Sequence, residues 1–528
     1  MLGLELVVVL CATVLVCQVV GDRLRIAPPI LLLAAGALLG FVPALREVHL
    51  PPEAMLLLFL PALLYWESLT TSLRGIRQDL RGIMLMSTAL VILTAWAVAA
   101  VAHAQGLPWG PAWVLGAAVA PTDATTVSAL ARMLPRRSIT LLRAESLIND
   151  GTALVVYGLA VGITVGEEDF TVPHVGWLFL LAYVGGAAAG AVTAWLGIQV
   201  RRRLDDPLLG NVVTILTPFT AFLLAEEIEA SGVLAVVVAG LIMSQAGPRL
   251  AGAAVTRRQG QAFWSLSTFL LNASLFVLVG LEAQSAARDL TSDDLTHALI
   301  TVGLVSVVLV AVRFAFQFGA VYLIRLLDRR PQQRLRRMSH RARVVGGVTG
   351  FRGAVSLAVA LSVPETLDSG APFPDRDVIV FVTSGVIMLT LVVQGLLLPR
   401  VVRWARLPHD ASAEEERSLA ETTAAEEALK ALPDVAAALG TAPEVAEWTR
   451  HEYETHLRVV RAADDETDDV VLRHKQDYTA LCLALLARKR ATVVRLRDEN
   501  HIDDTVLRQV QAYLDIEEMR LSGAELSD

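Results

Sequence analysis

Long apolar segments alternate with short polar loops over about the first four hundred residues of the chain. A helix needs about 20 apolar residues to cross the roughly 30 Å hydrocarbon core of a bilayer, and about thirteen segments meet or approach that length. They lie near residues 2–20, 27–44, 54–70, 83–104, 109–131, 139–165, 174–200, 207–226, 230–246, 262–284, 296–326, 344–364 and 377–402. The pattern predicts an all-α polytopic membrane protein with about thirteen transmembrane helices.

The charges in the loops predict how these helices are oriented. Every second loop holds a cluster of arginines: Arg23/Arg25, Arg74/Arg77/Arg81, Arg132/Arg136/Arg137, Arg201/Arg202/Arg203, Arg249/Arg257/Arg258, the run Arg325–Arg343, and Arg400/Arg403/Arg406. The loops between them are mainly acidic. Because short cytoplasmic loops are enriched in arginine and lysine, we expect an odd number of spans, an external N-terminus and a cytoplasmic C-terminal domain.

The composition changes after Leu407 to alanine, acidic residues, arginine and leucine. Ser412-Ala-Glu-Glu415 is typical of a helix start, and the helical run that it opens is expected to stop near Pro433. Further helical stretches are predicted near 443–463, 468–498 and 503–521. We therefore predict a transmembrane domain over residues 1–407 and a cytosolic helical domain over 408–528, with a regulatory or dimerisation role. A ligand-sensing domain is the less favoured alternative.

The overall composition supports the membrane assignment. The chain has 528 residues, of which 54% are hydrophobic, and a mean hydropathy of +0.54. The net charge of −8 averages an arginine-rich first part and an acidic last part. With three cysteines, neither a disulfide framework nor a zinc site is indicated. No phosphate loop or nucleotide-binding fingerprint occurs, so no cofactor and no nucleic-acid partner is predicted.

One predicted span contains two carboxylates, in Glu145-Ser-Leu-Ile-Asn-Asp-Gly-Thr-Ala153. A carboxylate at the centre of a membrane helix costs roughly 2.5–3.5 kcal/mol on insertion scales, so it marks a functional site by default. Glu145, Asn149 and Thr152 follow helical spacing, while Ser146 and Asp150 form a pair on the adjoining strip. One helix face therefore carries the polar set, and that face is expected to point away from lipid.

Two other spans are expected to be interrupted. Pro121-Thr-Asp123 places a proline and an acid inside the segment 109–131, and Arg352 follows three glycines at the start of the segment 344–364. Paired interrupted helices, one in each half of the chain, indicate an ion or substrate site in secondary transporters. We expect these two segments to correspond as crossing helices of inverted repeats.

Helix ends inside a membrane carry about half a unit charge each, and these partial charges need partners. Asp123 is suited to the positive N-terminal ends and Arg352 to the negative C-terminal ends. Asp123 is equally a candidate ion ligand. A further arginine in an apolar segment, Arg313, would suit Glu145 as a salt-bridge partner.

If Glu145 and Asp123 serve structural pairing, Asp150 is the acid that remains. Low dielectric favours the neutral form of a carboxylate, so near neutral pH a buried acid can hold a proton or a small cation, but hardly both. Oxygen atoms of Ser146, Thr122 and Asp123, with a few waters, would complete a shell suited to a hard cation. Glu67 and Glu226/Glu227 lie near predicted span ends, so we interpret them as interfacial acids.

The sequence resembles the monovalent cation/proton antiporter family, the sodium/proton exchangers, over roughly residues 1–405. The resemblance rests on Pro-Thr-Asp (121–123), Glu-Ser-Leu-Ile-Asn-Asp-Gly-Thr-Ala (145–153), Phe-Arg-Gly-Ala-Val-Ser-Leu-Ala (351–358) and Val-Gln-Gly-Leu-Leu-Leu-Pro (393–399). It implies a thirteen-helix homodimer that works by alternating access. It makes Asp150 the acid that carries ion and proton, Asn149 its structural neighbour, and Glu145–Arg313 a core salt bridge.

The resemblance also bears on stoichiometry. Asn149-Asp150 stands where other branches have two consecutive acids, and no lysine occurs before Lys430. These features resemble the electroneutral branch, which exchanges one cation for one proton. Ala124 departs from the proline that many relatives have after the Thr-Asp pair.

We therefore expect an antiporter, and not an enzyme, that exchanges Na⁺, or Li⁺ or K⁺, for H⁺ across the cell inner (plasma) membrane and contributes to pH homeostasis. Its partners would be these ions, membrane lipid and a second copy of the chain. A K⁺/H⁺-selective exchanger, a passive cation channel and a sensor on the same scaffold are the alternatives. Oxygen ligands accept Na⁺ and K⁺ alike, so the sequence leaves the choice of ion open.

Overall fold

The computed structural model describes residues 2–24, 26–42, 55–123, 134–166, 172–247, 253–289, 292–327, 339–367, 369–407, 412–464 and 469–522. Its contacts divide the chain into two compact units, Met1–Pro408 and His409–Asp528. In the described ranges the regular secondary structure is helical throughout.

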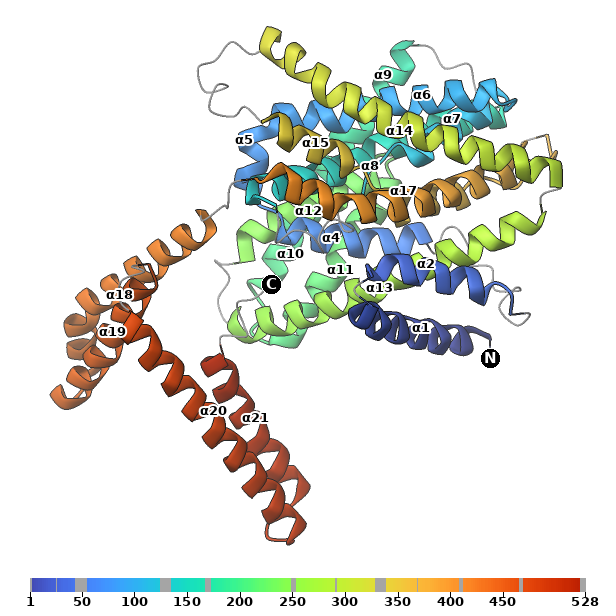
Figure 1. The fold of residues 1–528 in the computed structure, drawn as a ribbon. Coiled ribbons are helices and arrows are strands. Elements are labelled where there is room, and N and C mark those ends of the chain that lie inside the picture. The colour runs from blue at the N-terminus through green and yellow to red at the C-terminus, as the bar shows by residue number, and fades with distance from the viewer. Residues whose placement is uncertain are drawn as a thin grey trace. The chain divides into compact units, whose positions relative to one another are not determined.

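The first unit is a helical bundle (Figure 1). Its α-helices are α1 (Leu2–Leu24), α2 (Pro28–Leu39), α4 (Leu60–Thr70), α5 (Leu73–Met84), α6 (Val91–Ala104), α7 (Trp109–Val119), α8 (Arg136–Val165), α9 (Val172–Leu180), α10 (Gly186–Arg201), α11 (Pro207–Glu226), α12 (Gly232–Ala246), α13 (Ala253–Asp289), α14 (Ser292–Leu327), α15 (His340–Val348), α16 (Ala354–Leu361) and α17 (Arg376–Ala405). Short π-helical turns, η2 (Met55–Phe59), η3 (Leu85–Leu90) and η5 (Leu181–Gly185), lead directly into α4, α6 and α10.

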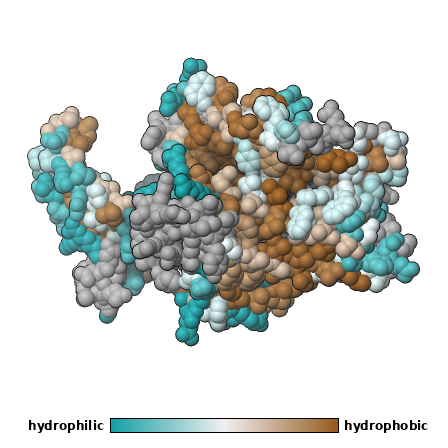
Figure 2. All heavy atoms as spheres, turned by 90° about the horizontal axis from the view of Figure 1, so that it is seen from above, coloured by the Kyte–Doolittle hydropathy of each residue, from teal (hydrophilic) through white to brown (hydrophobic). Residues whose placement is uncertain are grey.

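Eight continuous helical stretches in the described residues are long and apolar enough to cross a membrane. Shorter apolar helices, including α2, α7 and α12, lie among them. Figure 2 shows hydrophobic residues over the middle of the visible face of this unit, with hydrophilic residues gathered towards its edges. Such a surface suits a protein that is surrounded by lipid at mid-height.

Each predicted apolar segment overlaps a described helix, although several helices are longer than the apolar run that predicted them. The stretch predicted over 83–104 begins ten residues earlier, because Ser72 caps α5 by accepting a hydrogen bond from the Gly75 amide. Helix α5 contains many polar residues, so the apolar pattern did not predict it. The count of thirteen membrane crossings and the inverted repeat stay predictions.

Two helices are interrupted inside the bundle. Helix α7 ends at Val119, two residues before Pro121, and the rest of the predicted segment 109–131 beyond Asp123 lies outside the described residues. Between α15 and α16, residues 349–353 are not helical. The two non-helical stretches meet, because the Asp123 amide donates a hydrogen bond of 2.8 Å to the Phe351 carbonyl. Interrupted backbone thus lies where the side chains of the polar motifs converge.

Small residues bring several helix pairs into backbone contact. An added Cβ at Gly36 in α2 would overlap the Val277 backbone of α13, and one at Gly280 in α13 would overlap the Leu33 carbonyl of α2. Gly116 approaches the Ala95 carbonyl of α6 in the same way, and Gly190 approaches the Ala235 carbonyl of α12. Close approach through small residues is how helices pack in a membrane, where burial from lipid gives no hydrophobic driving force.

The second unit contains α18 (Ser412–Leu439), α19 (Pro443–Asp464), α20 (Asp469–Asp498) and α21 (Asp504–Ser522). Ion pairs join its helices, for example Arg461 with Glu426 at 2.6 Å and Arg520 with Glu452 at 3.2 Å. The expectation that the first helix stops near Pro433 is wrong, since α18 continues to Leu439. Pro433 removes one backbone hydrogen bond but is exposed, so water can solvate the freed carbonyl.

The α2–α13 contact provides a test of the packing. Replacing Gly36 with alanine is expected to lower the free energy of unfolding by about 1–3 kcal/mol, because overpacking displaces a neighbouring backbone. Thermal unfolding of the purified full chain measures the effect. Gly303→Ala in α14 is the matched control, because its added Cβ meets no atom within 4 Å. Equal stability of the two variants would contradict the close contact.

Candidate ion-binding site

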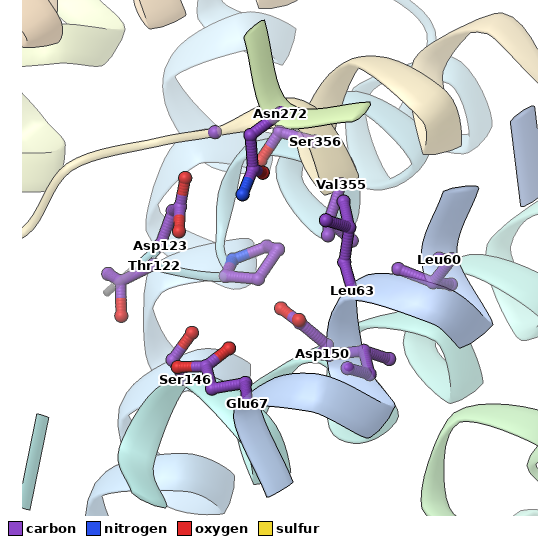
Figure 3. A pocket seen from close by; sticks show the side chains of 13 residues that line it. Leu60, Leu63, Glu67, Thr122, Asp123, Ser146, Asp150, Asn272, Val355 and Ser356 are labelled. Carbon is purple, nitrogen blue, oxygen red and sulfur yellow. The ribbon is translucent and has the colours of Figure 1, made fainter. Parts of the chain in front are cut away.

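A small cavity lies inside the first unit where α4, α8 and the two interrupted helices converge. Its volume is about 30 Å³, which is enough to hold water or a small ion. The carboxylates of Asp150, Asp123 and Glu67 border it (Figure 3). The remaining lining residues are Leu60, Leu63, Leu64, Pro121, Thr122, Ser146, Asn272, Gly353, Val355 and Ser356.

Helix α8 supplies the centre of this arrangement. Ser146 and Asp150 are four residues apart on α8, so both side chains project from one face toward the cavity, as Figure 3 shows. Both residues are buried, with 4% of their surface exposed. Glu145, one position away, lies on the neighbouring strip of the helix and faces α14 instead. The helical spacing in the sequence thus divides the polar motif between two environments.

Asp150 is an unpaired acid of the motif on α8. Within the described part of the chain its carboxylate has neither a hydrogen-bond partner nor an ion-pair partner. A buried carboxylate without partners must bind a cation, accept a proton or be hydrated, because an isolated charge in low dielectric is very costly. The cavity gives it room for one small guest.

Glu145 is paired with Arg313 on α14, as the sequence led us to expect. Arg313 Nη1 donates to Glu145 Oε1 at 2.7 Å, and Nη2 approaches Oε2 at 3.4 Å. Arg313 and Glu145 are 2% and 6% exposed, so the pair is fully buried. Arg313 Nε also donates to the Gly346 carbonyl in the last turn of α15 at 2.9 Å. All three nitrogens of the guanidinium are therefore satisfied.

Thr122 joins the paired acid to Asn149. Its hydroxyl donates to Glu145 Oε1 at 3.4 Å and accepts a bond of 2.9 Å from the Asn149 amide. The same amide approaches the Thr122 carbonyl at 3.3 Å. Asn149 borders a second, smaller cavity of about 10 Å³ beside Glu145, and does not line the cavity of Asp150. Asn149 thus ties the interrupted stretch of α7 to α8.

Arg352 and Asp123 lie at the ends of the interrupted helices. The Arg352 guanidinium is fully buried and donates to the Val119 carbonyl at the end of α7 at 3.0 Å, and to the Gly350 carbonyl. The Asp123 carboxylate lies against Gly353 at the start of α16, where an added Cβ would overlap it. The cation therefore faces a negative helix end and the anion a positive one. Asp123 also borders the cavity, so both of its expected roles remain open.

Glu67 is the site residue that sequence reasoning missed. We interpreted it as an interfacial acid because it lies near the end of its apolar segment, but its carboxylate borders the cavity beside Ser146 and Asp150 (Figure 3). The short helix α4 packs against α8, α12 and α13, which places its last turn inside the bundle. Asn272 on α13 and Ser356 on α16 were also missed. Glu67, Asn272 and Ser356 are each a polar residue within a predicted apolar segment, and this feature of the sequence could have indicated them as site residues.

The arrangement suits a dehydrated monovalent cation. Carboxylate, hydroxyl and amide oxygens line a small cavity, and hard cations prefer oxygen ligands. The arginines nearby are turned away from the cavity toward Glu145 and toward carbonyl groups. The site therefore combines cation ligands with an unpaired proton acceptor.

Comparison with known proteins agrees with this chemistry. The transmembrane model of the sodium/hydrogen exchangers matches residues 8–404. An uncharacterized Na⁺/H⁺ exchanger of Mycobacterium tuberculosis is 45% identical over 523 residues, which cover 98% of this chain and 96% of the relative. A protein of Bacillus pumilus named as a sodium, potassium, lithium and rubidium/H⁺ antiporter is 30% identical over 411 residues, or 74% of this chain and 60% of the relative.

A solved structure shows the same fold. The sodium proton antiporter of Methanocaldococcus jannaschii at pH 8 superposes with a TM-score of 0.57. The alignment covers 76% of this chain and 99% of that one at 16% identity.

Removing one partner of the buried ion pair is expected to destabilise the protein more than removing both. Arg313→Met is expected to lower the free energy of unfolding by about 3–5 kcal/mol, because it leaves Glu145 charged and unpaired in low dielectric. The double variant Glu145→Gln/Arg313→Met is expected to recover most of this loss. Thermal unfolding of both full-length variants measures the difference.

An exposed pair in the same unit is the control. Arg137 donates to Asp79 at 2.8 Å, and 45% of the Arg137 side chain is exposed. Arg137→Met is expected to lower the free energy of unfolding by at most about 1 kcal/mol. Equal losses for Arg313→Met and Arg137→Met would show that Glu145–Arg313 is not the buried pair described here.

Proposed function

Because the chain belongs to the sodium/hydrogen exchanger family and is therefore a multi-pass membrane transporter, we propose that it exchanges Na⁺ for H⁺ at the Asp150 cavity. The observation that carries the proposal is the state of Asp150, which is buried, borders a cavity and has no partner within the described residues. The neighbouring acid of the motif, Glu145, is paired. The Asp150 carboxylate is thus available to bind the transported ion.

The proposed cycle is a competition at that carboxylate. When Asp150 is ionised, its oxygens bind Na⁺ together with oxygens of Ser146, Thr122 and Asp123, and with Glu67. When Asp150 accepts a proton, its affinity for the cation falls and the cation leaves. Only these two occupied states neutralise the charge of Asp150, so only they should cross between the two sides of the membrane. Exchange follows without any input besides the ion gradients.

The stoichiometry that we propose is one cation for one proton. Asp150 is the acid of the cavity that belongs to the polar motif of α8, and Asn149 beside it is neutral and bonded to Thr122. One carboxylate that alternates between one proton and one monovalent cation moves no net charge. We further propose alternating access in a homodimer, in the cell inner membrane, with the C-terminal unit in the cytoplasm. The arginine-rich loops support this orientation.

The choice of ion depends on the size of the cavity in its occupied form. A space of about 30 Å³ has room for a dehydrated monovalent ion. The relative from Bacillus pumilus is named for sodium, potassium, lithium and rubidium. We propose Na⁺ as the main substrate and Li⁺ and K⁺ as further ones.

Asp150→Asn is expected to abolish exchange, because an amide neither binds a proton near neutral pH nor neutralises a cation. Dissipation of a preset pH gradient in sealed proteoliposomes, after addition of Na⁺, Li⁺ or K⁺, measures the loss. The matched control is Asp22→Asn, at an exposed position of α1, which should exchange at the native rate. Cation flux that persists without proton flux in the native protein would indicate a channel instead. Flux of neither ion would indicate a sensor.

Glu67→Gln is expected to weaken cation binding without abolishing exchange. The amide keeps an oxygen ligand but removes one negative charge from the cavity, so the KM for Na⁺ should rise by about tenfold at unchanged pH. Initial rates of sodium-driven pH change give KM and kcat separately. Glu226→Gln, near the end of α11 and outside the lining of the cavity, is the control. An unchanged KM in Glu67→Gln would remove Glu67 from the ion shell.

A further inference from the structure

A second, larger cavity opens at the ends of α15 and α17, away from the residues of the exchange site. Its volume is about 630 Å³. It is lined by four arginines and a tryptophan, namely Arg341, Arg400, Arg403, Trp404 and Arg406. All five residues are exposed. The described lining residues are thus all cationic or aromatic, in a cavity with the size of a small-molecule site.

The arginines of this cavity have no carboxylate partner among the described residues. Arg400 donates to the Leu396 carbonyl and Arg403 to the Pro399 carbonyl, each within its own helix. The Arg341 guanidinium lies over the Trp404 ring, with its Cζ atom 5.9 Å from the ring centroid. Within the described ranges no acidic side chain pairs with any of the four, whereas Arg137, Arg313, Arg461 and Arg490 all have acidic partners. Four unneutralised guanidiniums around one cavity attract an anion.

The face of α17 that leads to the cavity is apolar. Val393, Leu396 and Leu397 are 50%, 56% and 43% exposed. Each lies seven residues before a residue of the cavity lining, namely Arg400, Arg403 and Trp404 in that order. At helical spacing these residues share one face, which changes from aliphatic to cationic along the helix. A ligand that followed this face would need an apolar part beside Val393 and Leu397 and an anionic part beside Arg400 and Arg403.

From this order of residues we infer that the cavity binds the phosphate headgroup of an anionic phospholipid, whose acyl chains lie along the exposed aliphatic face of α17. Guanidinium groups bind phosphate oxygens in pairs, and an exposed tryptophan is typical of the level of lipid headgroups. Basic pockets between membrane helices on the cytoplasmic side are suited to phosphate headgroups. This assignment does not depend on the exchange mechanism. A soluble phosphate would satisfy the arginines but would leave the aliphatic face unused.

Lipid binding by the purified full chain tests the inference. Native mass spectrometry of the detergent-solubilised protein, titrated with phosphatidylglycerol, gives the Kd of the tightest bound lipid. Arg400→Gln/Arg403→Gln is expected to raise this Kd by roughly tenfold, because two cationic contacts with the headgroup are lost. Phosphatidylcholine, which has no net charge, should bind at least about tenfold more weakly to the native protein.

The control removes the same charge elsewhere. Arg202 and Arg203, exposed residues that follow α10, lie outside the cavity, so Arg202→Gln/Arg203→Gln should leave the Kd within about twofold of native. Equal weakening by both double variants would overturn the site in favour of general surface attraction. Displacement of the lipid by millimolar inorganic phosphate would overturn the lipid assignment in favour of a soluble anion.

A conservative variant separates binding from folding. If Arg400→Gln/Arg403→Gln fails to fold, Arg400→Lys/Arg403→Lys keeps the charge but loses paired hydrogen bonding, and should raise the Kd by about threefold. Native affinity in a folded form of either variant would overturn the inference.

Discussion

The energetic cost of a charge inside an apolar bundle is the constraint on which this structure depends. Several of the described charges near the crossing point have a partner that removes most of this cost. Glu145 is neutralised by Arg313, which also binds the end of α15, and Arg352 binds the end of α7. Asp123 lies against the start of α16. Asp150 and Glu67, which both border the cavity, have no side-chain partner in the described ranges, so a negative charge on Asp150 has to be balanced by a guest.

The interrupted helices make this arrangement possible, because they bring backbone dipoles to the depth where the acids lie. The hydrogen bond from Asp123 to Phe351 joins the two breaks, and the bonds from Asn149 to Thr122 join one break to α8. Around them, glycines bring α2 against α13 and α10 against α12. The polar centre is therefore held by short connections, while the surrounding helices meet through smooth, small-residue surfaces.

Much of the fold and part of the site could be predicted from the sequence, for reasons that individual residues make plain. Apolar length predicted the helices, and the cost of Glu145 and Asp150 in a span predicted a polar centre. The Glu145–Arg313 pair was predicted as well, and the structure contains it. Glu67 was not predicted, because its distance from the end of an apolar run says nothing about how deeply a short helix is packed. The start of α5 and the passage of α18 through Pro433 depend on a cap and on solvent exposure, which apolar periodicity does not reveal.

The central claim is that one carboxylate exchanges a proton for a cation, and it is tested most directly by the protons released when Na⁺ binds. Purified protein in weakly buffered detergent solution, at a pH where Asp150 is protonated, would be titrated with Na⁺ while the solution pH and the bound ion are recorded. The account predicts about one proton released per cation bound in the native chain, and neither binding nor release in Asp150→Asn. Binding of Na⁺ without proton release would contradict it.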